Sequence, residues 1–116
     1  MKTKEISIFE LVGDTAAVSS EDGNAVFGNI DKLLAEKAKI VLDFVNIKTL
    51  TSSFLNAAIG QLYSKYTSSF LKNHLEVKNL SPEDTELLKR VVERAKEYFK
   101  DKKGIEKEIK ETLGDE

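Results

Sequence analysis

The stretch from Lys39 to Tyr66 constrains the fold more than any other part of this chain. It opens with a β-branched and aromatic run, Ile40 to Val45, which is short enough for one strand and apolar enough to be covered on both faces. After a short polar passage, apolar residues recur at three- and four-residue intervals, which predicts an amphipathic helix over about 52–66. The hydroxyl-rich turn at 51–53 therefore follows the carboxyl end of a buried strand, where open α/β sheets tend to place their sites.

The segment before this stretch predicts two strands and a helix. Residues 5–12 alternate in polarity and read as a first strand, and a turn signal at Gly13 makes residues 16–18 a short hairpin partner. Ser19 has the spacing of a helix cap, and the helix that it starts is expected to run to about Glu36.

Two glycines interrupt this helix, and each costs up to about 1 kcal/mol relative to alanine. We interpret Gly23 and Gly28 as positions of close packing or of fraying near the amino end. A phosphate-binding loop is not expected, because neither of the usual glycine spacings is present.

The segment after the central stretch predicts a strand, a long helix and a tail. Residues 75–79 alternate as a half-exposed strand, and Ser81 followed by Pro82 is a strong start signal for a helix. Gly104 is expected to interrupt that helix. A helical tail over 104–116 follows, and its stripe of apolar residues would contact this domain or a second copy: Ile105, Ile109 and Leu113.

Together these elements predict an α/β fold with a mixed four-stranded sheet, three main helices and the C-terminal tail. The first strand is expected to pair antiparallel at an edge, and helical crossovers make the other three strands parallel. The domain would span residues 1–103 and remain folded without residues 104–116. Its predicted core consists of Ile40, Leu42, Phe44, Leu55, Ile59, Leu62, Leu88, Val91 and Val92.

Composition narrows the range of partners. The 116 residues carry 18 basic and 20 acidic side chains, so neither nucleic acid nor an acidic membrane surface is favoured as a partner.

The composition also limits the possible chemistry. The absence of cysteine excludes thiolate catalysis, and a single histidine, His74, leaves no pair of imidazoles for a metal; no cofactor or metal is expected. The chain shows no stretch of about 20 apolar residues and no signal-peptide pattern, so a cytoplasmic protein is expected.

Two groups of polar residues are candidates for chemistry. Asp43 is the one acid in an apolar strand, and it is either a site carboxylate or an acceptor for backbone N–H groups of the following turn. Thr51, Ser52 and Ser53 are nucleophiles, phosphoacceptors or helix caps. No base for activating a hydroxyl is evident, so an enzyme is not expected.

The residues of the central stretch resemble a known family. The run Val41-Leu42-Asp43-Phe44, then Ile47, Leu50 and Thr51-Ser52-Ser53-Phe54-Leu55, is similar to the bacterial STAS-like domains, whose function is unassigned and which are related to the anti-sigma-factor antagonists. The resemblance covers about residues 5–95. In those antagonists the turn reads Asp-Ser-Ser-Gly and a partner kinase phosphorylates its first serine, which corresponds to Ser52. This chain carries Thr51 in place of the aspartate and Phe54 in place of the glycine.

The resemblance implies a non-enzymatic regulatory module that binds a protein partner, such as a kinase or a regulatory factor. Ser52 and Ser53 are the candidate phosphoacceptors. The expected partner-binding residues are Thr51, Phe54, Asn56, Ala57 and Gln61. The alternative is a small-molecule or nucleotide sensor with a pocket at the strand ends, formed by Asp43, Ser19 and Gly23.

Overall fold

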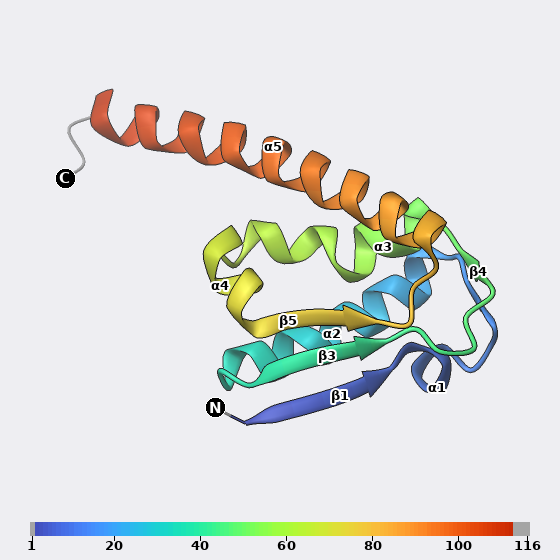
Figure 1. Ribbon diagram of the computed structural model, residues 1–116. Helices are drawn as coiled ribbons and strands as arrows, with labels where there is room; N and C mark the ends of the chain where they lie inside the picture. Colours follow the sequence, from blue (N-terminus) through green and yellow to red (C-terminus); the bar gives the residue numbers. More distant parts are fainter. Residues whose placement is uncertain (1, 113–116) are drawn as a thin grey trace.

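A parallel three-stranded sheet is the centre of the fold (Figure 1). The computed structural model describes the backbone of residues 2–112 and the side chains of residues 2–100. The strands are β1 (Thr3–Ser7), β3 (Lys39–Asp43) and β5 (Leu75–Lys78), and they lie in the order β1-β3-β5. Residues in register across the sheet, such as Ile6, Leu42 and Val77, share one face.

A second, two-stranded parallel sheet connects this layer to the helices. It pairs β2 (Ala16–Ala17) with β4 (Thr49–Leu50). The remaining described elements are α1 (Ile8–Val12), α2 (Ser20–Ala35), α3 (Ser52–Ala58), the 3₁₀ helix η1 (Gly60–Ser64), α4 (Ser68–His74) and α5 (Pro82–Thr112).

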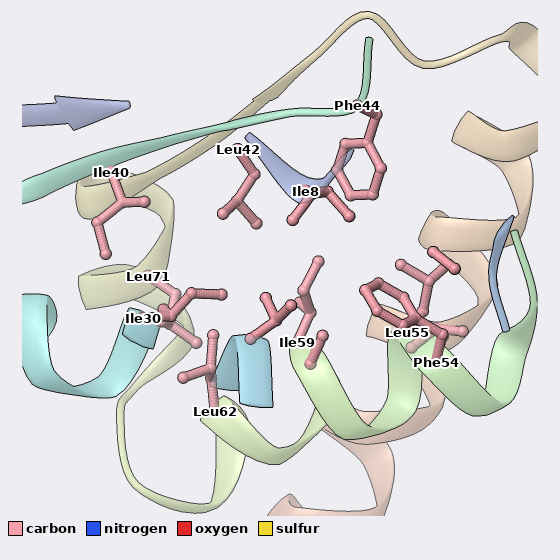
Figure 2. Packing of buried hydrophobic residues seen from close by; sticks show 14 of the residues in the cluster. Ile8, Ile30, Ile40, Leu42, Phe44, Phe54, Leu55, Ile59, Leu62 and Leu71 are labelled. Atoms are coloured by element: carbon pink, nitrogen blue, oxygen red, sulfur yellow. The ribbon is translucent and has the colours of Figure 1, made fainter. Parts of the chain in front are cut away.

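The core lies between the inner face of the main sheet and the helices. Figure 2 shows Ile40, Leu42 and Phe44 pointing from the β3 segment toward side chains of α2, α3, η1 and α4. Seven of the predicted core residues are at most 2% exposed, and the other two, Leu88 and Val92, are partly buried against the cluster. The sequence-based prediction of the core is therefore confirmed.

The outer face of the main sheet is open, so the prediction that β3 is covered on both faces was wrong. Glu5, Glu76 and Lys78 are exposed there, and Val41 between them is half-buried. Lys78 pairs with Glu5 at 2.8 Å, and Lys39 pairs with Glu76 at 3.1 Å. Ion pairs that are this exposed add little stability. They do, however, cover the outer face of β3 with charged side chains.

The predicted antiparallel first strand and the four-stranded mixed sheet were also wrong. β1 ends at Ser7, whose hydroxyl accepts a hydrogen bond from the Glu10 backbone N–H (3.1 Å) and so caps α1. Gly13, with φ of 77°, terminates that helix and makes no hairpin turn. β1 consequently pairs parallel with β3, and residues 16–17 join β4 in the smaller sheet.

The helical layer is more divided than the three main helices that the sequence predicted. The helix expected over 52–66 is α3 followed by η1, and α4 was not predicted. α4 begins where Thr67 accepts a hydrogen bond from the Phe70 backbone N–H (3.1 Å). The hydroxyl cluster at 67–69 thus ends one helical segment and starts the next.

The last helix is the longest element. The backbone of α5 is helical across position 104, so the interruption expected at Gly104 does not occur. Its carboxyl-terminal half extends past the body of the domain (Figure 1). The side chains of Ile105, Ile109 and Leu113, for which the sequence predicted a contact, lie outside the described residues. Within the described chain, no helix combines the length and the apolarity that crossing a membrane requires.

Candidate functional site

The smaller sheet brings two helix starts together. β2 leads into α2, and β4 leads into α3. Thr51 joins the two connections: its backbone N–H donates to the Ala17 carbonyl (3.2 Å), and its hydroxyl donates to the Val18 carbonyl (2.7 Å). Because β2 and β4 are parallel, the amino ends of α2 and α3 lie at the same edge of this sheet.

Each of these helices is capped by the hydroxyl that precedes it. The Ser19 side chain accepts from the Asp22 N–H (3.0 Å), which confirms its predicted role. The Thr51 side chain accepts from the Phe54 N–H (3.3 Å). Of the three hydroxyls predicted as caps or acceptors at this turn, Thr51 is therefore the cap of α3.

The two helices approach each other closely at Gly23. A Cβ atom at that position would lie 2.5 Å from the Phe54 carbonyl oxygen and 2.7 Å from the Ala57 Cβ. Close packing, one of the two explanations suggested for the glycines of α2, is thus the correct one for Gly23. At Gly28 a Cβ would have no neighbour within 4 Å.

This packing separates the predicted phosphoacceptors and partner-binding residues of α3 into a buried group and a more accessible group. Phe54 is 0% exposed and Ala57, which packs against α2 at Gly23, is 8% exposed, so neither offers surface to a partner. Ser53 and Asn56 are exposed and Ser52 is half-buried. We call the group formed by Ser52, Ser53 and Asn56 the hydroxyl surface.

Gln61 and Thr51 have structural contacts of their own. The Gln61 side-chain amide donates to the Asn24 side-chain oxygen (2.6 Å) and to the Ala57 carbonyl (2.7 Å), which ties η1 to α2 and α3. Both Gln61 and Thr51 are half-buried at the margin of the hydroxyl surface.

Asp43 belongs to a separate polar cluster at the carboxyl edge of the main sheet. Its Oδ1 accepts from the Val45 backbone N–H (2.9 Å) and from the Asn79 side chain (2.8 Å). The Asn79 hydrogen bond, together with that of Val45 and the Lys78 ammonium 4.0 Å away, lowers the Asp43 pKa although burial opposes the shift. The interpretation of Asp43 as an acceptor for the following turn is confirmed.

The three residues of the predicted pocket, Asp43, Ser19 and Gly23, belong to different parts of the fold. Asp43 ends a strand of the main sheet, whereas Ser19 follows a strand of the smaller one. The space beside Gly23 is filled by α3.

Grooves within the described chain lie along α5. One, of about 320 Å³, is lined by residues that include Asn56, Gln61, Arg94 and Tyr98, and Tyr98 is 64% exposed. Another, of about 680 Å³, lies between α5 and the residues at Tyr63 to Ser68. Neither groove could be predicted from the sequence, because both depend on where α5 crosses η1.

A third polar cluster, which the sequence did not predict, lies near the carboxyl end of α2. Asp31 accepts hydrogen bonds from the Tyr66 hydroxyl and the Lys65 ammonium, both at 2.7 Å. Burial, reinforced by Asp31, raises the Tyr66 pKa to about 12. The cluster fastens the end of η1 to α2 and is structural.

One pentapeptide occurs twice in the chain, so the site can be compared with a second copy of the same sequence. Thr-Ser-Ser-Phe-Leu stands at residues 51–55 and again at 67–71. Each copy starts a seven-residue helix, with the threonine as cap and the leucine buried. The sequence pattern predicted a helix start at the first copy alone, and the structure shows that the second copy starts α4 as well.

A comparison with models of protein families identifies the family of this chain. The model described as a STAS-like domain of unknown function covers residues 22–85, which is more than half of the chain. The matched span runs from the first turn of α2 to the first turn of α5 and includes the hydroxyl surface. Neither the curated proteins nor the solved structures provide a significant match.

Proposed function

The chain belongs to the family of STAS-like domains of unknown function, and we propose that it is a non-enzymatic regulatory module that binds a protein partner through the hydroxyl surface. One observation carries the proposal: Thr51 is the cap of α3, so the two serines that follow are not needed for capping. Within residues 2–100, neither the Ser52 nor the Ser53 hydroxyl makes a hydrogen bond to the protein.

The surroundings of the two serines suit contact with another protein. Ser53 and Asn56 stand one turn apart on the exposed side of α3. Val18, whose carbonyl accepts a hydrogen bond from the Thr51 hydroxyl, is 39% exposed and presents apolar surface near the start of α3. The groove that Asn56 shares with Tyr98 and Arg94 supplies side chains of the types that dominate interface energetics.

We further propose that phosphorylation at this surface regulates the partner. Ser52 is the position that the family resemblance indicates, and Ser53 is the more exposed of the two. The bulky Phe54 is fully buried, so it does not cover the serines from a kinase. A phosphate there would add a charge of about −1.5 to −2 to the docking surface and repel or attract the partner directly.

Substitution of each serine by aspartate tests the proposal. The partner is first isolated by co-purification from the native cell, and its affinity for Ser52→Asp and Ser53→Asp is measured by titration calorimetry. At least one of them should change the affinity about tenfold or more, equivalent to about 1.4 kcal/mol, while the melting temperature stays close to that of the unmodified protein.

The second pentapeptide provides the control. Ser69→Asp places the same charge at the equivalent position of α4, in the same five-residue context but on a different surface. It should leave the affinity unchanged. If all three variants bind the partner as the unmodified protein does, the hydroxyl surface is only part of the architecture.

A further inference from the structure

A stripe of four charged side chains runs along α5. Glu93, Lys96, Glu97 and Lys100 follow one another at the intervals that place residues on one side of a helix, and all four are exposed. Among the side chains of residues 2–100, none of them takes part in an ion pair within 4.0 Å. They line the larger groove, of about 680 Å³, whose other wall includes Tyr63 and Tyr66.

The order of charges in this stripe is self-complementary. Along the helix the signs alternate as negative, positive, negative, positive. When an identical stripe runs antiparallel about a two-fold axis between Lys96 and Glu97, Lys96 meets Glu97 of the other copy, and Glu93 meets its Lys100. A parallel arrangement would instead oppose like charges at every position.

We propose that a second copy of this chain docks on the charged stripe, so that two α5 helices pack antiparallel in a symmetric dimer. The two-fold axis lies at the middle of α5 (Pro82–Thr112), so the two helices would overlap along nearly their whole length. Such an interface is isologous and closed, because the same surface serves both copies.

Two further features of α5 fit this arrangement. Its carboxyl-terminal half extends beyond the body of its own domain, as Figure 1 shows, and is therefore accessible to a second helix. Val91 and Ala95, which are buried where α5 packs on the domain, lie on a different side of the helix from the stripe. The groove beside the stripe adds apolar surface from Tyr63 and Tyr66 to the charged contacts.

The dimer would use a surface separate from the hydroxyl surface. It goes beyond the proposed function, since partner binding at α3 requires no second copy. The sequence pattern had indicated contact through the residues after Gly104, whereas this inference concerns residues 93–100.

Charge reversal at the centre of the stripe tests the dimer. Sedimentation velocity over a wide range of concentration should show a reversible dimer for the unmodified chain. Lys96→Glu and Glu97→Lys, each alone, turn both central pairs into like-charge pairs and should weaken the dimer about tenfold or more. The double variant Lys96→Glu/Glu97→Lys restores opposite charges and should restore the dimer.

Mixing the two single variants is the most specific experiment. In an equimolar mixture every central position of one variant faces the opposite charge on the other, so a heterodimer should form although neither variant dimerises well alone. One variant is uniformly labelled with ¹⁵N, so that native mass spectrometry distinguishes the heterodimer from both homodimers by mass.

The controls separate this effect from net charge and from folding. Lys32→Glu and Glu36→Lys make the same charge changes on exposed positions of α2 and its carboxyl end, and should leave the dimer intact. Circular dichroism confirms that each variant is folded. A chain that stays monomeric at all concentrations, single reversals without effect, or a mixture that gives no heterodimer would each overturn the antiparallel stripe contact.

Discussion

At Gly23 even the smallest substitution, to alanine, should destabilise the fold. A methyl group there would meet backbone and side-chain atoms of α3 at 2.5 and 2.7 Å, so α2 and α3 would have to separate. We expect Gly23→Ala to lower the free energy of unfolding by about 1–3 kcal/mol. Urea unfolding of the purified variant measures the change.

Gly28, in the same helix, is the matched control. A methyl group there meets nothing within 4 Å, and alanine is the better helix former. Gly28→Ala should therefore stabilise the domain by up to about 1 kcal/mol. Equal effects of the two substitutions would contradict the close contact at Gly23.

Asn79 should control the acid stability of the chain through Asp43. Its side-chain hydrogen bond is the main cause that lowers the Asp43 pKa. A carboxyl with a lowered pKa in the folded state stabilises the fold above its unfolded pKa, and that contribution is lost as the pH falls through the folded pKa. Removing the amide should raise the Asp43 pKa, so unfolding by acid should begin at a higher pH.

Asn79→Gly is the suitable variant, because Asn79 has φ of 62° and glycine keeps that backbone conformation without strain. Carbon-detected NMR titration of the Asp43 carboxyl reports its pKa directly. An unchanged pKa in the variant would show that the Val45 N–H and Lys78 suffice to hold the carboxylate.

At the scale of elements, the start of α3 makes a prediction about capping. The Thr51 hydroxyl accepts a hydrogen bond from the Phe54 backbone N–H and donates one to the Val18 carbonyl. Thr51→Ala should cost about 1–2 kcal/mol of stability. Ser52→Ala, one residue later, removes no hydrogen bond found within residues 2–100 and should change stability by less than about 0.5 kcal/mol. Thermal unfolding of both variants distinguishes them, and the reverse order would make Ser52 the cap.

The elements that the sequence predicted well are those with a complete local signal. α2 has its cap at Ser19 and a long apolar stripe, and α5 has the start signal at Pro82. The elements that were missed are short: α1 has five residues, α4 has seven and β4 has two. Their length is below the window in which periodicity can be recognised, and tertiary contacts determine them.

The candidate site was predictable in its location but not in its orientation. The turn at 51–53 was identified because hydroxyls follow an apolar strand. Which side of α3 faces outward depends on the elements packed against it: Ala57 is buried against α2 at Gly23, and Phe54 is fully buried in the core. The sequence of α3 alone carries no information about how α3 packs against its neighbours. Two residues that were expected at the surface, Phe54 and Ala57, are therefore buried.

At the scale of the whole molecule, the α/β class was predicted correctly and the sheet was not. Gly13 in a left-handed conformation terminates a helix as readily as it forms a hairpin, and the two outcomes give opposite directions for the first strand. The five residues of α1 decide between them, because they turn the chain away before a hairpin can form. The parallel pairing of β1 with β3 follows.

The order β1-β3-β5 means that the main sheet is assembled in the direction in which a ribosome makes the chain. Each new strand finds its neighbour already synthesised, and none has to insert between two strands that are already paired. β3 can join β1 once α2 has been made, and β5 can join the free side of β3 after α4. The free edge of β3, through which a nascent chain could pair with another chain, is thus covered by the next strand of the same chain.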